Sequence, residues 1–339
     1  MPGRTGGAMT EQGETAGKRR RRAWGVTAAV VLVLAGVAGV ALRSPSPVGH
    51  WNSRSGRDAF LADYERAWQA MPRPDETLDV RTDFGFVRVY RFEGAPNARS
   101  QHPFVLLPGR SSPSPVWADN MPSLLQLGDV YALDLLGEPG LSVQEAPIED
   151  FADNAAWLDQ TLAALPAEKF HLLGLSIGGW TATNAATHFP GRVASLVLID
   201  PARTFAGIPV GTALRAIPAS VPWLPKAWRD SFTSYTAGGA PVEDEPLARM
   251  IETAMSAYTI TLPQPELIPE QDLAALEMPV LAVLAGESVM HDTATAAQVA
   301  ERTLRRGTVV VYPGASHAVG SEQAEAIATE IGAFLDAQR

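Results

Sequence analysis

One serine in this chain has the neighbours that a nucleophilic serine requires. Ser176 stands in the pattern Gly174-x-Ser176-x-Gly178, after the hydrophobic run 170–175 and before the small-residue run 177–188. The first run is typical of a short buried strand and the second of a helix. A turn that leads directly from strand to helix crowds the backbone, which accounts for the two glycines. The pattern predicts that Ser176 is a nucleophile; the alternative is a glycine-rich turn with an incidental serine.

A nucleophilic serine also needs a base that takes its proton, and histidine commonly fills that role. His317 follows the last predicted strand, in a loop that leaves the sheet at the same edge as Ser176. The order of serine, then acid, then histidine along the chain fits a catalytic triad. We therefore predict His317 as the base. The remaining histidines lie in a linker, beside strands, at a helix end or in a loop: His50, His102, His171, His188 and His291.

The elements around these residues alternate between strands and helices. The predicted strands are 78–82, 86–92, 104–107, 130–133, 170–175, 196–199, 280–285 and 308–312. The predicted helices are 116–127, 148–165, 177–188, 293–305 and 322–337. This alternation predicts an α/β fold in which a mainly parallel sheet has helices on both faces. Residues 78–82 and 86–92 are separated by a short turn and should form an antiparallel pair.

Residues 203–273 interrupt the alternation, because they are rich in Pro and Trp and contain no clear strand. An insertion after the fourth strand–helix unit would lie above the carboxyl ends of the strands, where α/β sheets bind ligands. We expect a helical cap there. It is either a lid that lines a substrate pocket or a subdomain with its own core. Trp223 and Trp228 favour an apolar pocket and hence an uncharged ester.

The amino-terminal segment has the pattern of a membrane anchor. Residues 1–22 are polar and end in a basic cluster, and residues 23–42 contain no charge. Twenty residues form a helix of about 30 Å, which is enough to cross a bilayer. The basic cluster predicts a disordered cytoplasmic tail, with the rest of the chain outside. A cleaved signal peptide, and hence a secreted protein, is the alternative.

Composition limits the chemistry and the partners. The chain has no cysteine, so a thiol nucleophile, a disulfide scaffold and a cysteine zinc site are excluded. Seven of the 27 basic and two of the 37 acidic residues precede residue 44. Residues 44–339 therefore contain 20 basic and 35 acidic residues, a net charge of −15. Such a domain repels phosphate backbones, and we do not expect a nucleic-acid partner.

Residues 78–339 resemble the α/β-hydrolase superfamily. The resemblance is carried by four segments: an oxyanion loop at residues 107–110, a turn that begins with Asp at 134–142, the serine turn at 174–179 and the histidine loop at 314–317. It implies that the backbone N–H groups of Ile177 and Arg110 stabilise an oxyanion. Pro108 stands where the family usually has histidine. Since the donor is a backbone group, we expect activity to survive this difference.

The acid is the least regular part of the resemblance. The family usually has Gly-x-x-Asp after the penultimate strand, whereas this chain has Gly-Glu-Ser-Val at residues 286–289. Asp292, further along the same loop, is our first choice of acid. Glu287, nearer the strand, is the second, and its longer side chain could make up for a short reach. Asp200, after the strand 196–199, is the third.

These observations predict an exported, membrane-anchored serine hydrolase that cleaves a carboxylic ester through an acyl-enzyme. Residues 23–42 would be the anchor, 43–55 a linker and 56–339 the catalytic domain. No metal or cofactor is implied. The alternatives are a lipase, thioesterase or peptidase with the same chemistry, or an anchored binding protein that has kept the fold and lost turnover.

Overall fold

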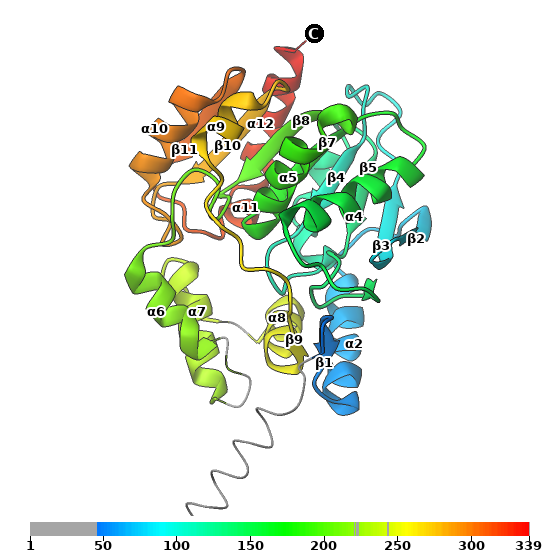
Figure 1. The fold of residues 1–339 in the computed structure, drawn as a ribbon, viewed down its shortest axis with the longest axis vertical. Helices are drawn as coiled ribbons and strands as arrows, with labels where there is room; N and C mark the ends of the chain where they lie inside the picture. Colours follow the sequence, from blue (N-terminus) through cyan, green and yellow to red (C-terminus); the bar gives the residue numbers. More distant parts are fainter. Residues whose placement is uncertain (1–45, 220, 222–223, 243, 339) are drawn as a thin grey trace, which may run out of the picture. The chain divides into compact units, whose positions relative to one another are not determined.

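The hydrophobic runs predicted as strands form one large sheet in the structure, a computed structural model that describes residues 46–219, 221, 224–242 and 244–338 (Figure 1). The strands follow the order β11, β10, β8, β7, β4, β5, β3, β2, and the short β6 pairs with β3. The pairs from β11 through β5 are parallel, and those that involve β3 are antiparallel. The bounds are β2 (Glu76–Thr82), β3 (Gly85–Phe92), β4 (Phe104–Leu107), β5 (Val130–Leu133), β6 (Val143–Gln144), β7 (Phe170–Leu175), β8 (Val193–Ile199), β10 (Val280–Ala285) and β11 (Gly307–Tyr312).

Helices cover both faces of this sheet, as predicted. One face packs against α4 (Phe151–Ala164), α5 (Ile177–His188), α9 (Glu270–Ala275) and α10 (Thr293–Thr303). The other packs against η1 (Ser114–Trp117), α3 (Met121–Leu124), α11 (Val319–Glu322) and α12 (Ala324–Asp336). Successive strand residues point to opposite faces. In β4, Val105 and Leu107 therefore belong to the first core, and Phe104 and Leu106 to the second.

The predicted helix 116–127 is wrong, because this segment contains the two short helices η1 and α3 instead of one. Pro122 lies in the first turn of α3, where a missing N–H and a fixed φ are tolerated. In the middle of a continuous helix the same proline would remove a backbone hydrogen bond. The sequence patterns also did not predict β6 or the small two-stranded sheet of β1 (His50–Trp51) and β9 (Tyr258–Thr259).

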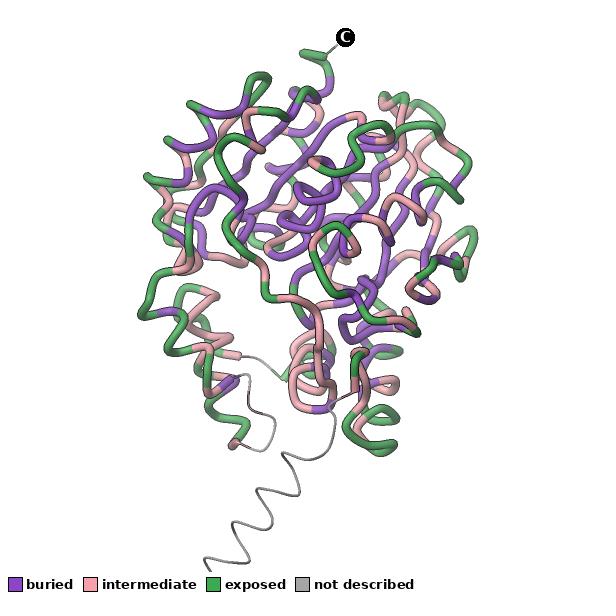
Figure 2. The backbone as a smooth tube through the Cα atoms, in the orientation of Figure 1, coloured by how far each residue is buried: buried purple, intermediate pink, exposed green. Residues whose placement is uncertain are grey.

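The cap predicted at residues 203–273 is helical. It contains α6 (Val210–Ala219), α7 (Lys226–Thr236) and α8 (Pro246–Ala257), followed by β9 and most of α9. α8 packs against α2 (Arg54–Trp68) through the buried side chains of Phe60, Tyr64, Met250 and Ala254. Figure 2 shows that the central strands of the sheet are buried, whereas α6 and α7 are exposed or half-buried over most of their length. The cap is thus attached to the body more firmly through α8 than through α6.

The predicted tail 1–22 and apolar segment 23–42 lie outside the described residues. Within the predicted linker 43–55, the described part contains β1, and α2 begins at Arg54. None of the helices in the described part of the chain is both long and apolar enough to cross a bilayer.

Candidate active site

Ser176 lies at the tight turn between β7 and α5. Its backbone is left-handed, with φ 53° and ψ −114°, and its N–H donates to the carbonyl oxygen of Ile199 in β8 at 3.0 Å. The two glycines are sterically required. A Cβ at Gly174 would lie 2.4 Å from the carbonyl oxygen of Gly178, and one at Gly178 would lie 1.9 Å from that of Leu107. The sequence therefore permits a strained turn that exposes a hydroxyl at the carboxyl edge of the sheet.

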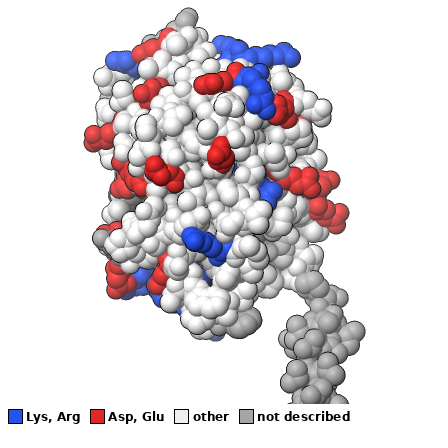
Figure 3. Space-filling view, turned by 90° about the vertical axis from the view of Figure 1, so that its left-hand side faces the viewer, with Lys and Arg blue, Asp and Glu red and all other residues white. Residues whose placement is uncertain are grey.

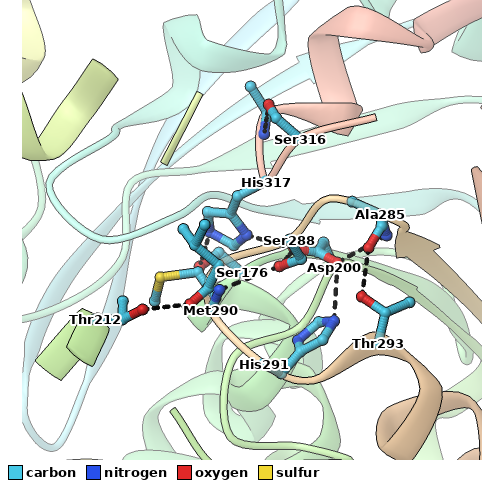
Figure 4. Close-up of polar contacts among 12 residues, drawn as sticks. Ser176, Asp200, Thr212, Ala285, Ser288, Met290, His291, Thr293, Ser316 and His317 are labelled. Atoms are coloured by element: carbon cyan, nitrogen blue, oxygen red, sulfur yellow. Dashed lines mark hydrogen bonds and ion pairs between the residues drawn. The ribbon is translucent and has the colours of Figure 1, made fainter. Parts of the chain in front are cut away.

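The structure brings His317 to this serine, as the sequence predicted. Nε2 of His317 lies 2.9 Å from Oγ of Ser176, and Nδ1 lies 2.6 Å from Oδ2 of Asp200 (Figure 4). Because a carboxylate accepts only, Nδ1 carries the proton, which leaves Nε2 as the acceptor for the serine hydroxyl. Serine, histidine and aspartate thus form a continuous line of hydrogen bonds. The three residues come from the ends of β7, β8 and the loop after β11.

Asp200 is held in a fully buried site. Its Oδ1 accepts from the backbone N–H of Ala285 at 2.9 Å, and its Oδ2 accepts from Oγ of Ser288 at 2.6 Å. Burial alone would raise the pKa of Asp200. The contacts with His291 and His317 outweigh burial and hold that pKa well below its usual range. Asp200 is therefore ionised at neutral pH.

The structure does not place our first two choices of acid against His317. The carboxylate of Asp292 is exposed and caps α10, where it accepts from the N–H of Thr295 at 2.8 Å. Glu287 is also exposed, and its backbone N–H donates to the carbonyl oxygen of Ala315. The expectation that the loop after β10 supplies the acid is therefore wrong. Asp200, which we ranked third, occupies that place because β8 lies beside β7, one strand closer to Ser176 than β10.

The two predicted oxyanion donors border the serine. The loop of Gly109 is adjacent, since a Cβ built on Gly109 would lie 3.8 Å from the Cβ of Ser176. Neither the N–H of Arg110 nor that of Ile177 has an acceptor among the residues that the structure describes. Ile177 begins α5, so its N–H also lies at the positive end of that helix. Two free N–H groups near a serine hydroxyl can stabilise a developing negative charge.

Glu138 anchors the oxyanion loop, a role that the sequence did not reveal. It belongs to the turn after β5 that has one residue more than the family pattern. Its buried carboxylate accepts from the N–H of Ser111 at 3.1 Å and lies 3.8 Å from the guanidinium of Arg110. Ser111 has a left-handed backbone, with φ 54°. Burial raises the pKa of Glu138, and Arg110 and the Ser111 N–H oppose that rise.

Asp134, at the start of the same turn, ties the turn to the segment after the oxyanion loop. Its fully buried carboxylate accepts from the N–H and Oγ of Ser114, at 2.9 and 2.6 Å, and from the N–H of Leu141 at 2.7 Å. The hydroxyl of Tyr64 in α2 donates to it at 3.1 Å. Burial raises the pKa of Asp134, and these donors counteract the rise. The network fixes the loops on both sides of the serine.

Two cavities lie near this edge. A small one of about 20 Å³, room for about one water, is bordered by Arg110, Ile177 and Glu138. A larger one of about 330 Å³ lies in the cap between α7 and α8 and reaches Ser321 of α11, four residues after His317. In the described ranges, no group of three or more His, Asp or Glu residues is arranged to hold a metal ion.

Comparisons with known proteins agree with this geometry. The sequence profile of the alpha/beta hydrolase family matches residues 104–330. Carboxylesterase YbfK of Bacillus subtilis is 24% identical over 290 residues, which cover 81% of this chain and 93% of that protein. N-formylmaleamate deformylase of Pseudomonas putida is 29% identical over 249 residues, 69% of this chain and 89% of that protein.

Solved structures show the same fold. The crystal structure of B. subtilis carboxylesterase CesB (YbfK) has a TM-score of 0.74 and 24% identity, and covers 83% of this chain and 98% of that one. That of naproxen esterase, also from B. subtilis, has a TM-score of 0.75 and 22% identity, and covers 84% and 99%. The strand order, the serine turn and the matched family profile lead to one conclusion: the chain belongs to the alpha/beta hydrolase family.

Proposed function

We propose that this protein is a serine carboxylesterase that works through an acyl-enzyme. The observation that carries the proposal is the line of hydrogen bonds from Ser176 through His317 to Asp200. Nε2 of His317 takes the hydroxyl proton as Oγ bonds to the ester carbonyl carbon. The imidazolium then gives that proton to the departing alkoxide, and the ester C–O bond breaks. Water, deprotonated by the same nitrogen, then attacks the acyl-enzyme, and Oγ leaves with the returned proton.

The backbone around the serine supplies the remaining element of the mechanism. Attack on the carbonyl forms an alkoxide, which the free N–H groups of Ile177 and Arg110 would bind. Both donors are positioned before the substrate arrives: Ile177 by the start of α5, and Arg110 by the Glu138 contact with Ser111. The carboxylesterases among the relatives support an ester, while the deformylase shows that a relative can act on another acyl group.

The surroundings of the site support an uncharged ester. Carboxylates line the cap cavity at Asp230, Glu245 and Glu252, and two of them pair with Lys226 and Arg229. An anionic group that entered this cavity, whose lining includes neither Ser176 nor His317, would meet these acids and is therefore disfavoured. Much of the face shown in Figure 3 is uncharged, with acidic and basic side chains scattered over it. Trp223, part of our original argument for an apolar pocket, lies outside the described residues, and Trp228 is half exposed.

We further propose that the enzyme is exported and held at the membrane by residues 23–42. The support is the sequence alone, an uncharged run preceded by Lys18 to Arg22. Cell fractionation with protease added to the outer face tests it, because the catalytic domain should then be digested from a membrane fraction. A mature protein that starts at about residue 39 or 42 would show signal cleavage instead.

Covalent labelling tests the serine chemistry. A fluorophosphonate probe should label Ser176 in the full-length protein, and the label should be found on the peptide that contains it. Ser176→Ala, which removes one oxygen atom, should abolish both labelling and hydrolysis of p-nitrophenyl butyrate while the protein stays folded. A folded wild type without labelling or turnover would favour the binding-protein alternative.

A further inference from the structure

His291 is a buried histidine whose position the proposed mechanism does not use. It follows β10 in the loop 286–292 and is only 2% exposed. Its Nε2 lies 3.2 Å from Oδ1 of Asp200 (Figure 4). Within the described residues, neither ring nitrogen makes an aligned hydrogen bond. Buried polar groups are almost always satisfied, so an imidazole left against the carboxylate of the candidate triad calls for an explanation.

The surroundings of the ring define its protonation state. The oxygen that faces Nε2 belongs to an ionised carboxylate, which only accepts, so the proton belongs on Nε2. A second proton on Nδ1 would create a buried charged donor without an acceptor. That costs more than an unfilled lone pair on a neutral ring. We therefore assign His291 as the neutral tautomer with its N–H aimed at Asp200.

The loop that carries His291 is fixed at several points. Oγ1 of Thr293 donates to the carbonyl oxygen of Ala285 at 2.7 Å, and Oγ of Ser288 donates to Asp200. From the cap, Oγ1 of Thr212 in α6 donates to the carbonyl oxygen of Val289 at 2.6 Å. The loop thus holds the ring of His291 in place, with Nε2 facing Oδ1 of Asp200. This is the arrangement expected of a side chain that positions another group.

We propose that His291 is a positioning residue for the triad carboxylate. Its Nε2 lies 3.2 Å from Oδ1 of Asp200, and the N–H attracts that oxygen without an aligned hydrogen bond, which favours one plane of the carboxylate and keeps Oδ2 on Nδ1 of His317. The loop after β10, where we had expected the acid, therefore supplies two donors, Ser288 and His291, to an acid on the neighbouring strand. The inference rests on the proposed serine-hydrolase function. It adds a residue that contacts neither substrate nor nucleophile.

The proposal has a consequence for the pH dependence of the reaction. The charged and titratable groups around the ring are Asp200 at the end of β8, Asp292 beside it in the loop, and His317 on the other oxygen of Asp200. A donor on Oδ1 draws negative charge away from Oδ2. Without that donor, Oδ2 stabilises the His317 imidazolium more strongly, so the acidic limb of the kcat/KM profile should move to higher pH.

The test compares His291→Gln with His291→Asn in the full-length protein. The amide nitrogen of glutamine can occupy the place of Nε2, whereas that of asparagine is one methylene too short. Both variants are polar and uncharged, so they differ mainly in reach. His171→Asn is the matched control, because it also removes a buried imidazole, one in β7 that bonds Oγ of Ser195 in β8 at 2.7 Å.

His291→Asn should lower kcat by about tenfold, because Asp200 loses the N–H that faces its Oδ1, and should leave KM unchanged. The acidic limb of its kcat/KM profile should move to higher pH. His291→Gln should recover most of kcat and the wild-type position of the acidic limb. His171→Asn should change neither kcat nor the position of that limb. Equal kcat and equal profiles in the Gln and Asn variants, or the same shift in the His171 control, would overturn the proposal.

A second measurement does not depend on turnover. Proton NMR of the Nδ1–H of His317 should show a downfield signal in the wild type and in His291→Gln. In His291→Asn this signal should be shifted upfield or broadened, since the carboxylate is no longer held. An unchanged signal in His291→Asn would count against His291 even if the ester assay failed. Failure of fluorophosphonate labelling in the wild type would instead count against the proposed function.

Discussion

The two ends of strands β7 and β8 are built differently. At their carboxyl ends the chain turns through left-handed conformations at Ser176 and Asp200, with φ of 53° and 41°. At their amino ends, His171 of β7 lies opposite Ser195 of β8 in the register, and the two side chains share a buried hydrogen bond. Among the described residues, all four non-glycine residues with positive φ follow the carboxyl ends of β4, β7 or β8: Ser111, Ser176, Asp200 and Arg203.

The strained backbone therefore lies at one end of these strands, and a buried hydrogen bond that supports folding lies at the other. Left-handed backbone at a non-glycine residue costs of the order of 1–3 kcal/mol and persists only where the surrounding structure enforces it. Here the enforcing structure is a pair of parallel strands in which all residues but one in each are buried. The carboxyl edge therefore has the strained turns, whereas the amino end of β7 has a register irregularity between Phe170 and His171 but no left-handed residue. Changes at the first edge should alter chemistry and changes at the second should alter folding.

The largest effect is expected at the carboxyl end of β8. Asp200→Asn should keep the shape of the site. The amide can donate to Nδ1 of His317, however, and so favour the tautomer that has its proton on Nε2 and cannot accept the serine proton. The expected loss in kcat is about ten-thousandfold, as for other triad Asp→Asn changes. Steady-state hydrolysis of p-nitrophenyl butyrate measures it, and thermal unfolding serves as the control for folding. A loss below about tenfold would mean that the site works as a serine–histidine dyad.

The second prediction concerns the amino end of β7. Burial, with a smaller contribution from His102, lowers the pKa of His171 from 6.5 to about 4. Between these values the unfolded chain binds a proton that the folded chain does not, so stability falls as the pH falls. The loss should reach about 3 kcal/mol between pH 6.5 and pH 4. Denaturant unfolding at several pH values measures it.

His171→Asn removes the titrating group and provides the control. The slope of its unfolding free energy against pH should be flatter than that of the wild type in this window, while kcat at neutral pH stays unchanged. A variant with the wild-type slope would assign the pH dependence to other groups. A variant with a lowered kcat would contradict the division between the two edges.

The third prediction returns to the carboxyl edge, at the oxyanion loop. Glu138→Ala removes the acceptor of the Ser111 N–H and frees the loop that presents Arg110. The expected fall in kcat is about ten- to a hundredfold, somewhat less than for outright loss of one oxyanion donor. Glu138→Gln keeps an acceptor oxygen and should cost much less. If both variants lost the same activity, the charge of Glu138 rather than its hydrogen bond would matter.

The sequence predicted the strands that position the site better than it predicted the acid. The strands 104–107, 130–133, 170–175 and 280–285 have the predicted bounds, because each is a short apolar run between turn residues. Ser176 and His317, whose side chains the structure brings within 2.9 Å, could be proposed because their turns are visible locally. Asp200 directly follows a buried strand, a signal that was present, but only the order β7, β8, β10 shows that this strand is the closer neighbour of Ser176. Glu138 and His291 had no local signal, since their partners are distant in sequence.

The smallest effect is expected from Asp292, which lies at the carboxyl edge but outside the site. Its carboxylate caps α10 through the N–H of Thr295, and hydrogen bonding with the side chain and the N–H of Thr295 holds its pKa below the usual value. Asp292→Ala should therefore lower the unfolding free energy, because it removes the N-cap of α10. Asp292→Ser should restore most of this loss, since serine also caps helices. In both variants kcat should match the wild type in the ester assay. A large loss of kcat in both, with unfolding unchanged, would return Asp292 to the triad and refute the assignment of Asp200.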